Sequence, residues 1–137
     1  MEAKAAPRIK TSQRRIQYKS SAWCVHEFEV WSGELVCRVA ALRMKDSLLL
    51  WIGGNAKPAL VEVAAGVPMP PSNGSARAGL ATALISGDGV AVTLARRLSA
   101  TLVRPVYVCC GATFDRFTAP LVERGLIAEI KSRPECF

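Results

Sequence analysis

The feature that most constrains the fold is a short apolar segment at residues 47–52, with the sequence SLLLWI. After the serine every position is apolar, so a strand built from it needs cover on both faces, and Gly53-Gly54 ends it. Its length suits a strand rather than a helix. A tryptophan buries about 150–250 Å² in a core. The segment therefore predicts a buried strand, and we expect Trp51, like Trp31, to pack in the core.

Two more strands are expected before this segment. Residues 24–31 alternate between less charged and more charged positions, the period of two that is typical of a half-buried strand. Ser32-Gly33 predicts a turn. Residues 35–44 are rich in aliphatic side chains, and their periodicity alone fits a strand or a helix. We predict a strand, because Lys45-Asp46 is typical of a tight connection to the apolar segment.

Short strands are also expected after the apolar segment, at residues 59–64, 80–85 and 106–110. Between the first two, residues 66–79 contain three prolines within four positions, followed by Asn73-Gly74. Prolines donate no ladder or helix hydrogen bonds, and Asn-Gly favours turns, so this stretch predicts a loop.

Two helices are expected in the second half of the chain. Apolar residues recur at spacing four in the first, behind Asp88 as a candidate N-cap. These are Val90, Leu94, Leu98 and Leu102. The second helix is expected to begin near Phe117 or later, because Pro120 is tolerated only in a first turn, and to end at Pro134. Asp115 is its candidate cap, and its expected inner side holds Phe117, Leu121, Ile127 and Ile130.

Strands that come first and helices that follow indicate an α+β fold. We predict a small antiparallel β-sandwich or sheet of about six strands with two helices in the C-terminal half. The net charge of +7 is concentrated in residues 1–20, which carry six basic side chains and one acidic one. We therefore expect a disordered basic extension at residues 1–21 and a single domain at residues 22–137. An organelle transit peptide is the alternative for the extension.

Candidates for catalysis or metal binding lack partners in the sequence. The five cysteines, at 24, 37, 109, 110 and 136, have neither the even number of a disulfide framework nor the C-x-x-C spacing of a zinc site. Cys109 and Cys110 would point to opposite faces of a strand. His26 is the only histidine, and we expect a structural role for it. Residues 86–89, SGDG, lack the pattern of a P-loop and predict a plain turn. We expect no enzyme activity, cofactor or metal.

The sequence gives little support to the hypothesis of a membrane protein or of a nucleic-acid-binding protein. No apolar run reaches the roughly 18–20 residues of a membrane span, and the N-terminus lacks the apolar core of a secretory signal. The basic extension has only Tyr18 and Trp23 nearby as stacking groups. A small basic-tailed nucleic-acid-binding protein remains the alternative function.

Three blocks of sequence resemble the proteasome assembly chaperone 4 family. Residues 46–53, DSLLLWIG, are similar to that family's Asp-Ser-Leu-x-Leu-Trp-Val-Gly strand, and His26 and Phe28 match the block's start. The second block is the LARR stretch at residues 94–97 with the strand at 106–108. The third runs from residues 121–124 to the terminal Pro-Glu-Cys-Phe. The basic extension, the proline-rich loop and Cys109-Cys110-Gly111 depart from the family pattern.

The resemblance implies a non-catalytic chaperone of the cytoplasm, and also of the nucleus. It would pair with a proteasome assembly chaperone 3-like subunit and bind proteasome α subunits to promote formation of the α-ring. A sheet with an exposed apolar face needs another chain to cover it, which agrees with a pairing role. Candidate residues for the second, α-subunit contact are Arg96 and Arg97, together with the 66–79 loop. No small-molecule substrate is expected.

Overall fold

The computed structural model describes residues 6–7, 15–33, 35–54, 58–70 and 78–137. It contains one six-stranded sheet with strand order β1-β2-β3-β6-β4-β5. The strands are β1 (Cys24–Ser32), β2 (Leu35–Arg43), β3 (Leu48–Gly53), β4 (Glu62–Pro68), β5 (Gly79–Ile85) and β6 (Val106–Cys110). The helices are α1 (Val90–Leu102), α2 (Ala119–Ser132) and a final 3₁₀ turn, η1 (Pro134–Cys136).

The α+β prediction is confirmed, with a single sheet in place of a sandwich. Four of the five strand pairings are antiparallel, and the pairing of β3 with β6 is parallel. The chain reaches β6 only after α1, so this late strand is inserted between β3 and β4. The apolar segment at 47–52 therefore becomes an inner strand, as its composition predicts.

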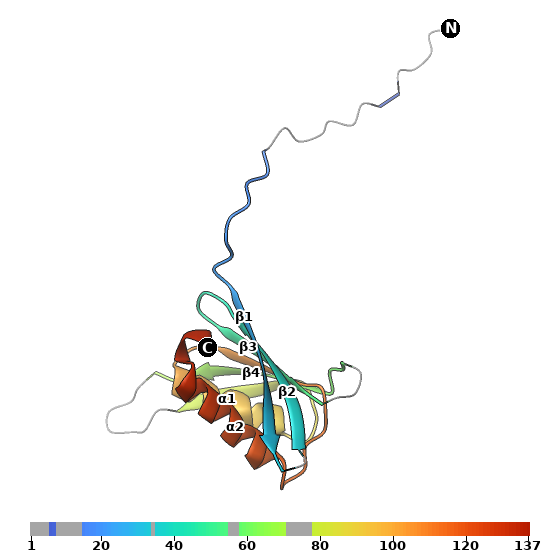
Figure 1. Cartoon of the computed structure of the whole chain (residues 1–137), viewed down its shortest axis with the longest axis vertical. Helices are drawn as coiled ribbons and strands as arrows, with labels where there is room; N and C mark the ends of the chain where they lie inside the picture. The colour runs from blue at the N-terminus through green and yellow to red at the C-terminus, as the bar shows by residue number, and fades with distance from the viewer. Residues whose placement is uncertain (1–5, 8–14, 34, 55–57, 71–77) are drawn as a thin grey trace.

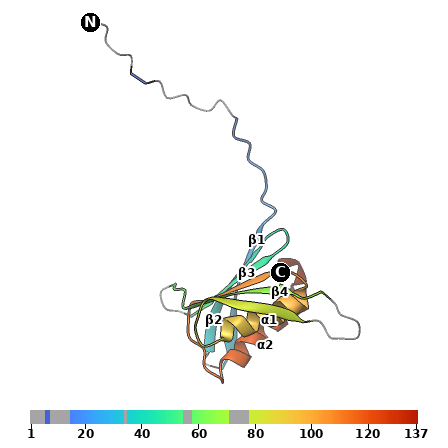
Figure 2. The same ribbon diagram turned by 180° about the vertical axis from the view of Figure 1, so that it is seen from behind.

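Both helices lie on the same side of the curved sheet, and the view from behind agrees (Figure 1 and Figure 2). Helix α1 packs on β4, β5 and β6, while α2 packs on β1. Alternate residues of the inner strands meet them, including Leu50, Ile52 and Val108, all fully buried. The core is therefore the layer between the helices and one face of the sheet.

Glycines allow each helix to approach the sheet closely. A Cβ on Gly66 of β4 would lie 2.3 Å from the carbonyl oxygen of Ala95 in α1. A Cβ on Gly125 of α2 would lie 2.4 Å from Cγ1 of Val30 in β1. Both distances are shorter than any normal van der Waals contact, so a larger residue would push the layers apart.

The predicted strand at 59–64 is wrong in its bounds, because β4 begins at Glu62 and continues to Pro68. Residue 61 instead uses its backbone N–H to bond the carbonyl of Cys110 at the end of β6, at 2.8 Å. The predicted 66–79 loop is correspondingly too long. Gly66 and Val67 pair with β5, and Pro68 is tolerated because it ends the strand, where its missing N–H is least needed. Residues 71–77 of that loop lie outside the described residues.

The two predicted helix caps are also wrong. Gly89, not Asp88, precedes α1, and the side chain that caps this helix comes from another strand: Glu62 Oε1 accepts the backbone N–H groups of Gly89 (3.0 Å) and Ala91 (3.1 Å). Asp115 accepts from Phe117 and Thr118 in the turn before α2, and these bonds lower the pKa of its carboxyl group.

The expected inner side of α2 is right for Ile130, which is buried, and for Ile127, which packs against the core, but wrong for Phe117. The helix begins at Ala119, so Phe117 lies outside it and is 70% exposed. The buried residues of α2 are Val122, Leu126 and Ile130, which recur at spacing four. Pro120 lies in the first turn, as predicted.

Candidate functional site

The face of the sheet opposite the helices carries no element of the described chain, and we call it the open face. Its residues alternate with the core residues along each strand. They are Val25, Glu27, Glu29 and Trp31 of β1; Arg38, Ala40 and Leu42 of β2; Leu49 and Trp51 of β3; Tyr107 and Cys109 of β6; Val63, Ala65 and Val67 of β4; and Leu80 and Thr82 of β5.

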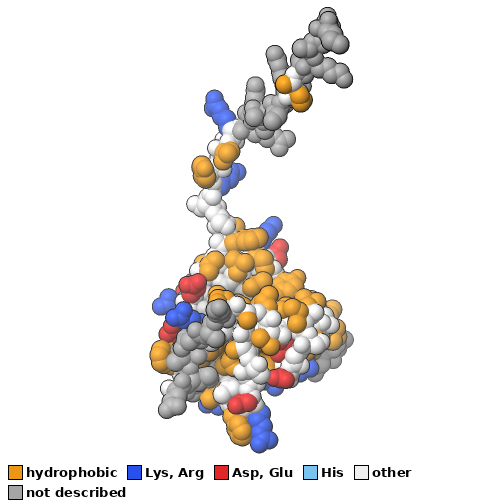
Figure 3. All heavy atoms as spheres, turned by 90° about the vertical axis from the view of Figure 1, so that its right-hand side faces the viewer, with side chains coloured by type: hydrophobic (Ala, Val, Ile, Leu, Met, Phe, Trp, Pro, Cys, Tyr) orange, Lys and Arg blue, Asp and Glu red, His pale blue; other side chains and the backbone are white. Residues whose placement is uncertain are grey.

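The middle of the open face is apolar. Tyr107 lies at its centre, because its register partners are Leu49 on β3 and Ala65 on β4. Its side chain is 37% exposed, and exposure rises toward β5, with Val67 at 47% and Leu80 at 57%. A side view of the domain shows hydrophobic side chains gathered in a broad patch, with charged side chains mostly around it (Figure 3). Patches of this kind on a folded domain mark contact surfaces.

The expectation that Trp31 and Trp51 pack in the core is wrong. Trp31 is 67% exposed, and its indole N–H donates to Glu29 at 3.1 Å. Trp51 lies half-buried on the open face, where its N–H donates to the carbonyl of Ala59 at 3.2 Å. Strand β3 is apolar on both sides, as predicted, but the helices cover only one of them.

Two glycines hold the indole of Trp51 flat against the sheet. A Cβ on Gly53 would come within 2.2 Å of the indole ring, and one on Gly111 within 2.8 Å. The ring therefore lies directly on backbone at both positions, and its outer surface faces away from the sheet. The sequence offered a signal for this arrangement, since Gly53 follows Trp51 at spacing two and so shares its face.

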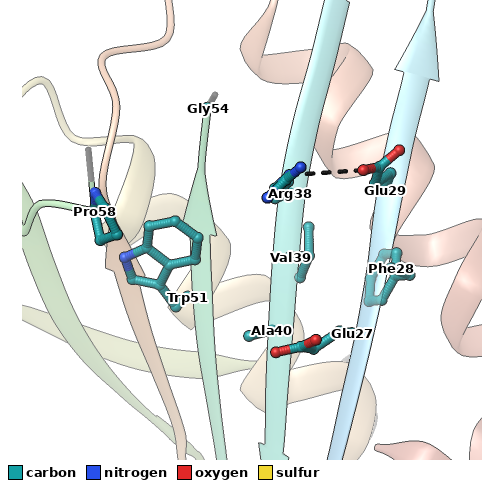
Figure 4. Close-up of a pocket in the computed structure, with 9 residues that line it drawn as sticks. All are labelled: Glu27, Phe28, Glu29, Arg38, Val39, Ala40, Trp51, Gly54 and Pro58. Atoms are coloured by element: carbon teal, nitrogen blue, oxygen red, sulfur yellow. Dashed lines mark ion pairs between the residues drawn. The ribbon is translucent and has the colours of Figure 1, made fainter. Parts of the chain in front are cut away.

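The β1–β2 side of the open face is charged and hollowed. Arg38 lies 3.6 Å from Glu29 on the neighbouring strand, and both are exposed. A hollow of about 460 Å³ is lined by these two residues and by Glu27, Phe28, Val39, Ala40, Trp51, Gly54 and Pro58. Figure 4 shows Trp51 beside Pro58 on one side of the hollow, with Glu27 and Glu29 on the other. The open face thus combines an apolar middle with a polar hollow.

Arg96 and Arg97 lie on the other side of the molecule, on the exposed surface of α1. Arg97 donates to both carboxylate oxygens of Glu123 in α2, at 2.8 and 2.6 Å. This pair links the two helices, so Arg97 has a structural contact that the sequence did not reveal. Arg96 has no ion pair among the described residues.

His26 lies on the helix side of β1. Its Nε2 is 2.9 Å from Glu129 of α2, and its ring stacks on Phe28 and meets the edge of Phe137. Among the described residues no serine or cysteine hydrogen-bonds to it. The imidazole joins α2 and the C-terminal residues to β1, a structural role as predicted.

The cysteines and the 86–89 turn show no reactive arrangement among the described residues. Cys110 is buried on the helix side, which raises its pKa to about 12, while Cys109 points to the open face, as the alternation predicts. Glu62 occupies the first N–H donors of α1, so they are not available to a phosphate. The described residues contain no group of three or more His, Cys, Asp or Glu that could hold a metal ion. No described helix has the length and apolarity to cross a bilayer.

The described chain is thus a one-sheet α+β domain whose distinctive surface is an open sheet face. The sequence profile described as proteasome assembly chaperone 4 matches residues 37–111, which is more than half of the chain. The chain belongs to the proteasome assembly chaperone 4 family.

A solved structure has the same fold. It is the crystal structure of a chaperone complex for yeast 20S proteasome assembly, with a TM-score of 0.55 and 16% sequence identity. The match covers 84% of this chain and 94% of the other. No curated protein matches the chain. Family membership makes this protein a proteasome assembly chaperone, and the family strand at residues 46–53 is the strand that places Trp51 on the open face.

Proposed function

We propose that this chain is a non-catalytic assembly chaperone that pairs with a proteasome assembly chaperone 3-like subunit through its open face. As a pair, the two subunits bind proteasome α subunits and promote formation of the α-ring, in the cytoplasm and the nucleus. The observation that carries the proposal is the apolar middle of the open face, around Tyr107, which no described element covers.

The size of the open face suits a specific contact. Five inter-strand spacings of about 4.8 Å make the sheet roughly 24 Å wide, and strands of about seven residues are roughly 23 Å long. With side-chain relief included, this is comparable with the accessible surface of about 800 Å² that each partner buries in a standard interface. Two sheets that pack face to face interdigitate their side chains at a separation of about 10 Å. A related sheet is therefore a natural cover for this one.

A charged substitution at the centre of the open face tests the pairing. Tyr107→Asp places a carboxylate where the proposed interface is driest, and we expect it to weaken pairing on the order of 100-fold. Ala128→Asp, on the exposed side of α2, is the matched control and should pair normally. The measurement is light scattering after size exclusion of the chain mixed with a chaperone 3-like subunit. If both variants pair like the unchanged chain, the open face is not the interface.

In this arrangement the outer surface of the helices remains available for an α subunit. Arg96 is the cleaner residue to test there, because Arg97 also joins α1 to α2 through Glu123. We expect Arg96→Glu to leave pairing intact and to reduce capture of α subunits several-fold, since a rim charge contributes mainly to encounter and orientation. Equal capture by the Arg96→Glu pair and the unchanged pair would remove Arg96 from the contact.

The alternative of nucleic-acid binding through the basic extension predicts a different result. Removal of residues 1–20 would then abolish binding to a nucleic-acid probe whose affinity falls steeply with salt. Under our proposal the same truncation leaves pairing unchanged.

A further inference from the structure

The hollow on the open face has an acidic side and an aromatic side. Glu27 of β1, Ala40 of β2 and Trp51 of β3 are register partners, so they form one row across three strands. Ala40 is small and leaves space between the other two side chains. Adjacent strands are about 4.8 Å apart, so the Glu27 and Trp51 side chains start from backbone positions roughly 10 Å apart. Figure 4 shows this row, with the carboxylate of Glu27 beside Ala40.

The charge of the hollow is negative. Glu29 lies against Arg38 and also accepts the indole N–H of Trp31, so its charge is compensated. Glu27 makes no ion pair with any described residue. The described residues that line the hollow thus supply two carboxylates and one guanidinium, and Glu27 is the excess charge.

Trp51 offers the second element that a cation requires. Its indole is held flat by Gly53 and Gly111 and is fixed by the hydrogen bond to Ala59. The outer surface of an aromatic ring carries partial negative charge and attracts ammonium or guanidinium groups, with tryptophan the strongest of the aromatic residues. A long basic side chain also has an apolar stem, which suits a floor formed by Ala40 and the outer surface of the indole.

We propose that this hollow receives a lysine or arginine side chain of the partner subunit, with its head group at Glu27 and its stem against Trp51. The inference rests on the proposed function, because it places the partner on the open face. The location supports a protein side chain as the occupant, since the hollow is continuous with the apolar middle that the partner would cover.

The same charges disfavour a second copy of this chain as the partner. Among the described residues, the charged side chains of the open face are Glu27, Glu29 and Arg38, and this arginine is already paired. Two copies face to face would bury four carboxylates with two guanidinium groups, and a buried uncompensated charge is strongly destabilising. A partner with a basic residue at the matching position removes this penalty, so the hollow selects a different chain over an identical one.

The test measures the affinity of the full chain for the purified chaperone 3-like subunit at several salt concentrations. Glu27→Gln removes the charge and keeps the shape, and we expect it to raise Kd about tenfold with a weaker dependence on salt. Trp51→Leu should also raise Kd, and Trp51→Phe, which keeps a ring, by less. Glu135→Gln, an exposed carboxylate at the C-terminal turn, is the control and should leave Kd unchanged. Circular dichroism checks that each variant is folded.

The outcomes separate this inference from the proposed function. If the unchanged chain does not bind the partner at all, the proposed function fails. If it binds, and Glu27→Gln has the same Kd and salt dependence, the inference alone is overturned. Lys57 is close in sequence to the hollow, between Gly54 and Pro58. If Glu27→Gln raises Kd in the unchanged chain but has no effect in Lys57→Ala, the effect of Glu27 acts through Lys57. The chain would then fill its own hollow, and this would also overturn the inference.

Discussion

The two faces of the sheet carry similar apolar side chains but have different surroundings. On the face of the sheet that α1 and α2 cover, here called the helix face, Leu50 and Ile52 are fully buried. On the open face their strand neighbours Leu49 and Trp51 are only half-buried, because no described element lies over them. A hydrophobic side chain contributes to stability in proportion to the area it removes from water. The helix face therefore stabilises the single chain, while most of the open face can contribute only when another surface covers it.

The faces also differ in how tightly they are packed. On the helix face, the layers approach so closely at Gly66 and Gly125 that neither position has room for a Cβ. On the open face, Ala40 leaves a hollow of about 460 Å³ between Glu27 and Trp51. Dense packing suits a permanent core, and an unfilled, partly charged surface suits a contact that forms and separates.

Adjacent leucines of β3 provide the largest expected difference between the faces. Leu50→Ala should lower the free energy of unfolding of the single chain by about 2–5 kcal/mol, because it leaves a cavity in the core. Leu49→Ala, one residue away on the open face, should lower it much less and should instead weaken pairing with the partner. Chemical denaturation of each variant, alone and with the partner, measures both effects. Equal destabilisation of the single chain would mean that something already covers the open face.

The glycine contact under α1 is expected to give the next largest effect. Gly66→Ala forces its Cβ against the carbonyl of Ala95, and we expect a loss of about 1–3 kcal/mol in the free energy of unfolding. Gly54→Ala is the matched control, because a Cβ there meets no atom of the described residues within 4 Å. Thermal unfolding compares the two. A Gly66→Ala variant as stable as the control would show that α1 can shift away from the sheet.

Alkaline pH should lower the free energy of unfolding of the chain, because the helix face contains buried thiols. Burial raises the pKa of Cys37 to about 11 and that of Cys110 to about 12, from an ordinary value of 9.0. Thiols that stay protonated in the folded chain but ionise in the unfolded one add stability that is complete below pH 9. This stability is lost as pH rises from 9 toward 12, by at most about 1.4 kcal/mol per pH unit for each thiol.

The check is the slope of the unfolding free energy against pH over that window. Cys110→Ala lowers the absolute stability by leaving a small cavity, but its slope should be shallower than that of the unchanged chain. Parallel slopes would place Cys110 in a less buried environment than the fold indicates.

The smallest effect is a change in labelling rate with no change in stability. Cys109 on the open face and Cys110 on the helix face are neighbours, so one peptide reports both. We expect a thiol reagent to label exposed Cys24 first, Cys109 slowly because burial raises its pKa, and Cys110 only after unfolding. Addition of the partner should protect Cys109 and leave Cys24 unchanged. Fragment-ion mass spectrometry resolves the adjacent residues, and continued labelling of Cys109 in the pair would contradict an interface there.

Local patterns predicted most of the elements. Alternation placed β1, the apolar run placed β3, and spacing four placed α1, since each depends on a pattern that the chain itself shows. For β2 periodicity did not separate strand from helix, and the tight Lys45-Asp46 connection favoured a strand. The caps were not predictable in the same way. Asp88 and Asp115 are suitable capping residues by type, yet Glu62 caps α1 from a strand that is distant in sequence.

The candidate site was predicted only in part. The alternation of Cys109 and Cys110 gave the two faces of β6, but no pattern showed that Tyr107 would be the centre of one face. That position depends on β6 lying between β3 and β4, which follows from the crossover through α1. The assignment of Trp31 and Trp51 to the core failed because hydrophobicity predicts burial without saying which chain provides the cover.

The sequence alone determined the α+β class, the inner strand at 47–52 and the family resemblance, because these depend on side-chain periodicity and on short motifs. Only the tertiary structure decided which face of the sheet the helices cover, and therefore which apolar residues remain exposed. Periodicity assigns a residue to one face of its own strand, whereas strand order and helix placement depend on contacts between distant parts of the chain. The open face, the contact of Trp51 with Gly53 and Gly111, and the hollow beside Glu27 all depend on these tertiary contacts.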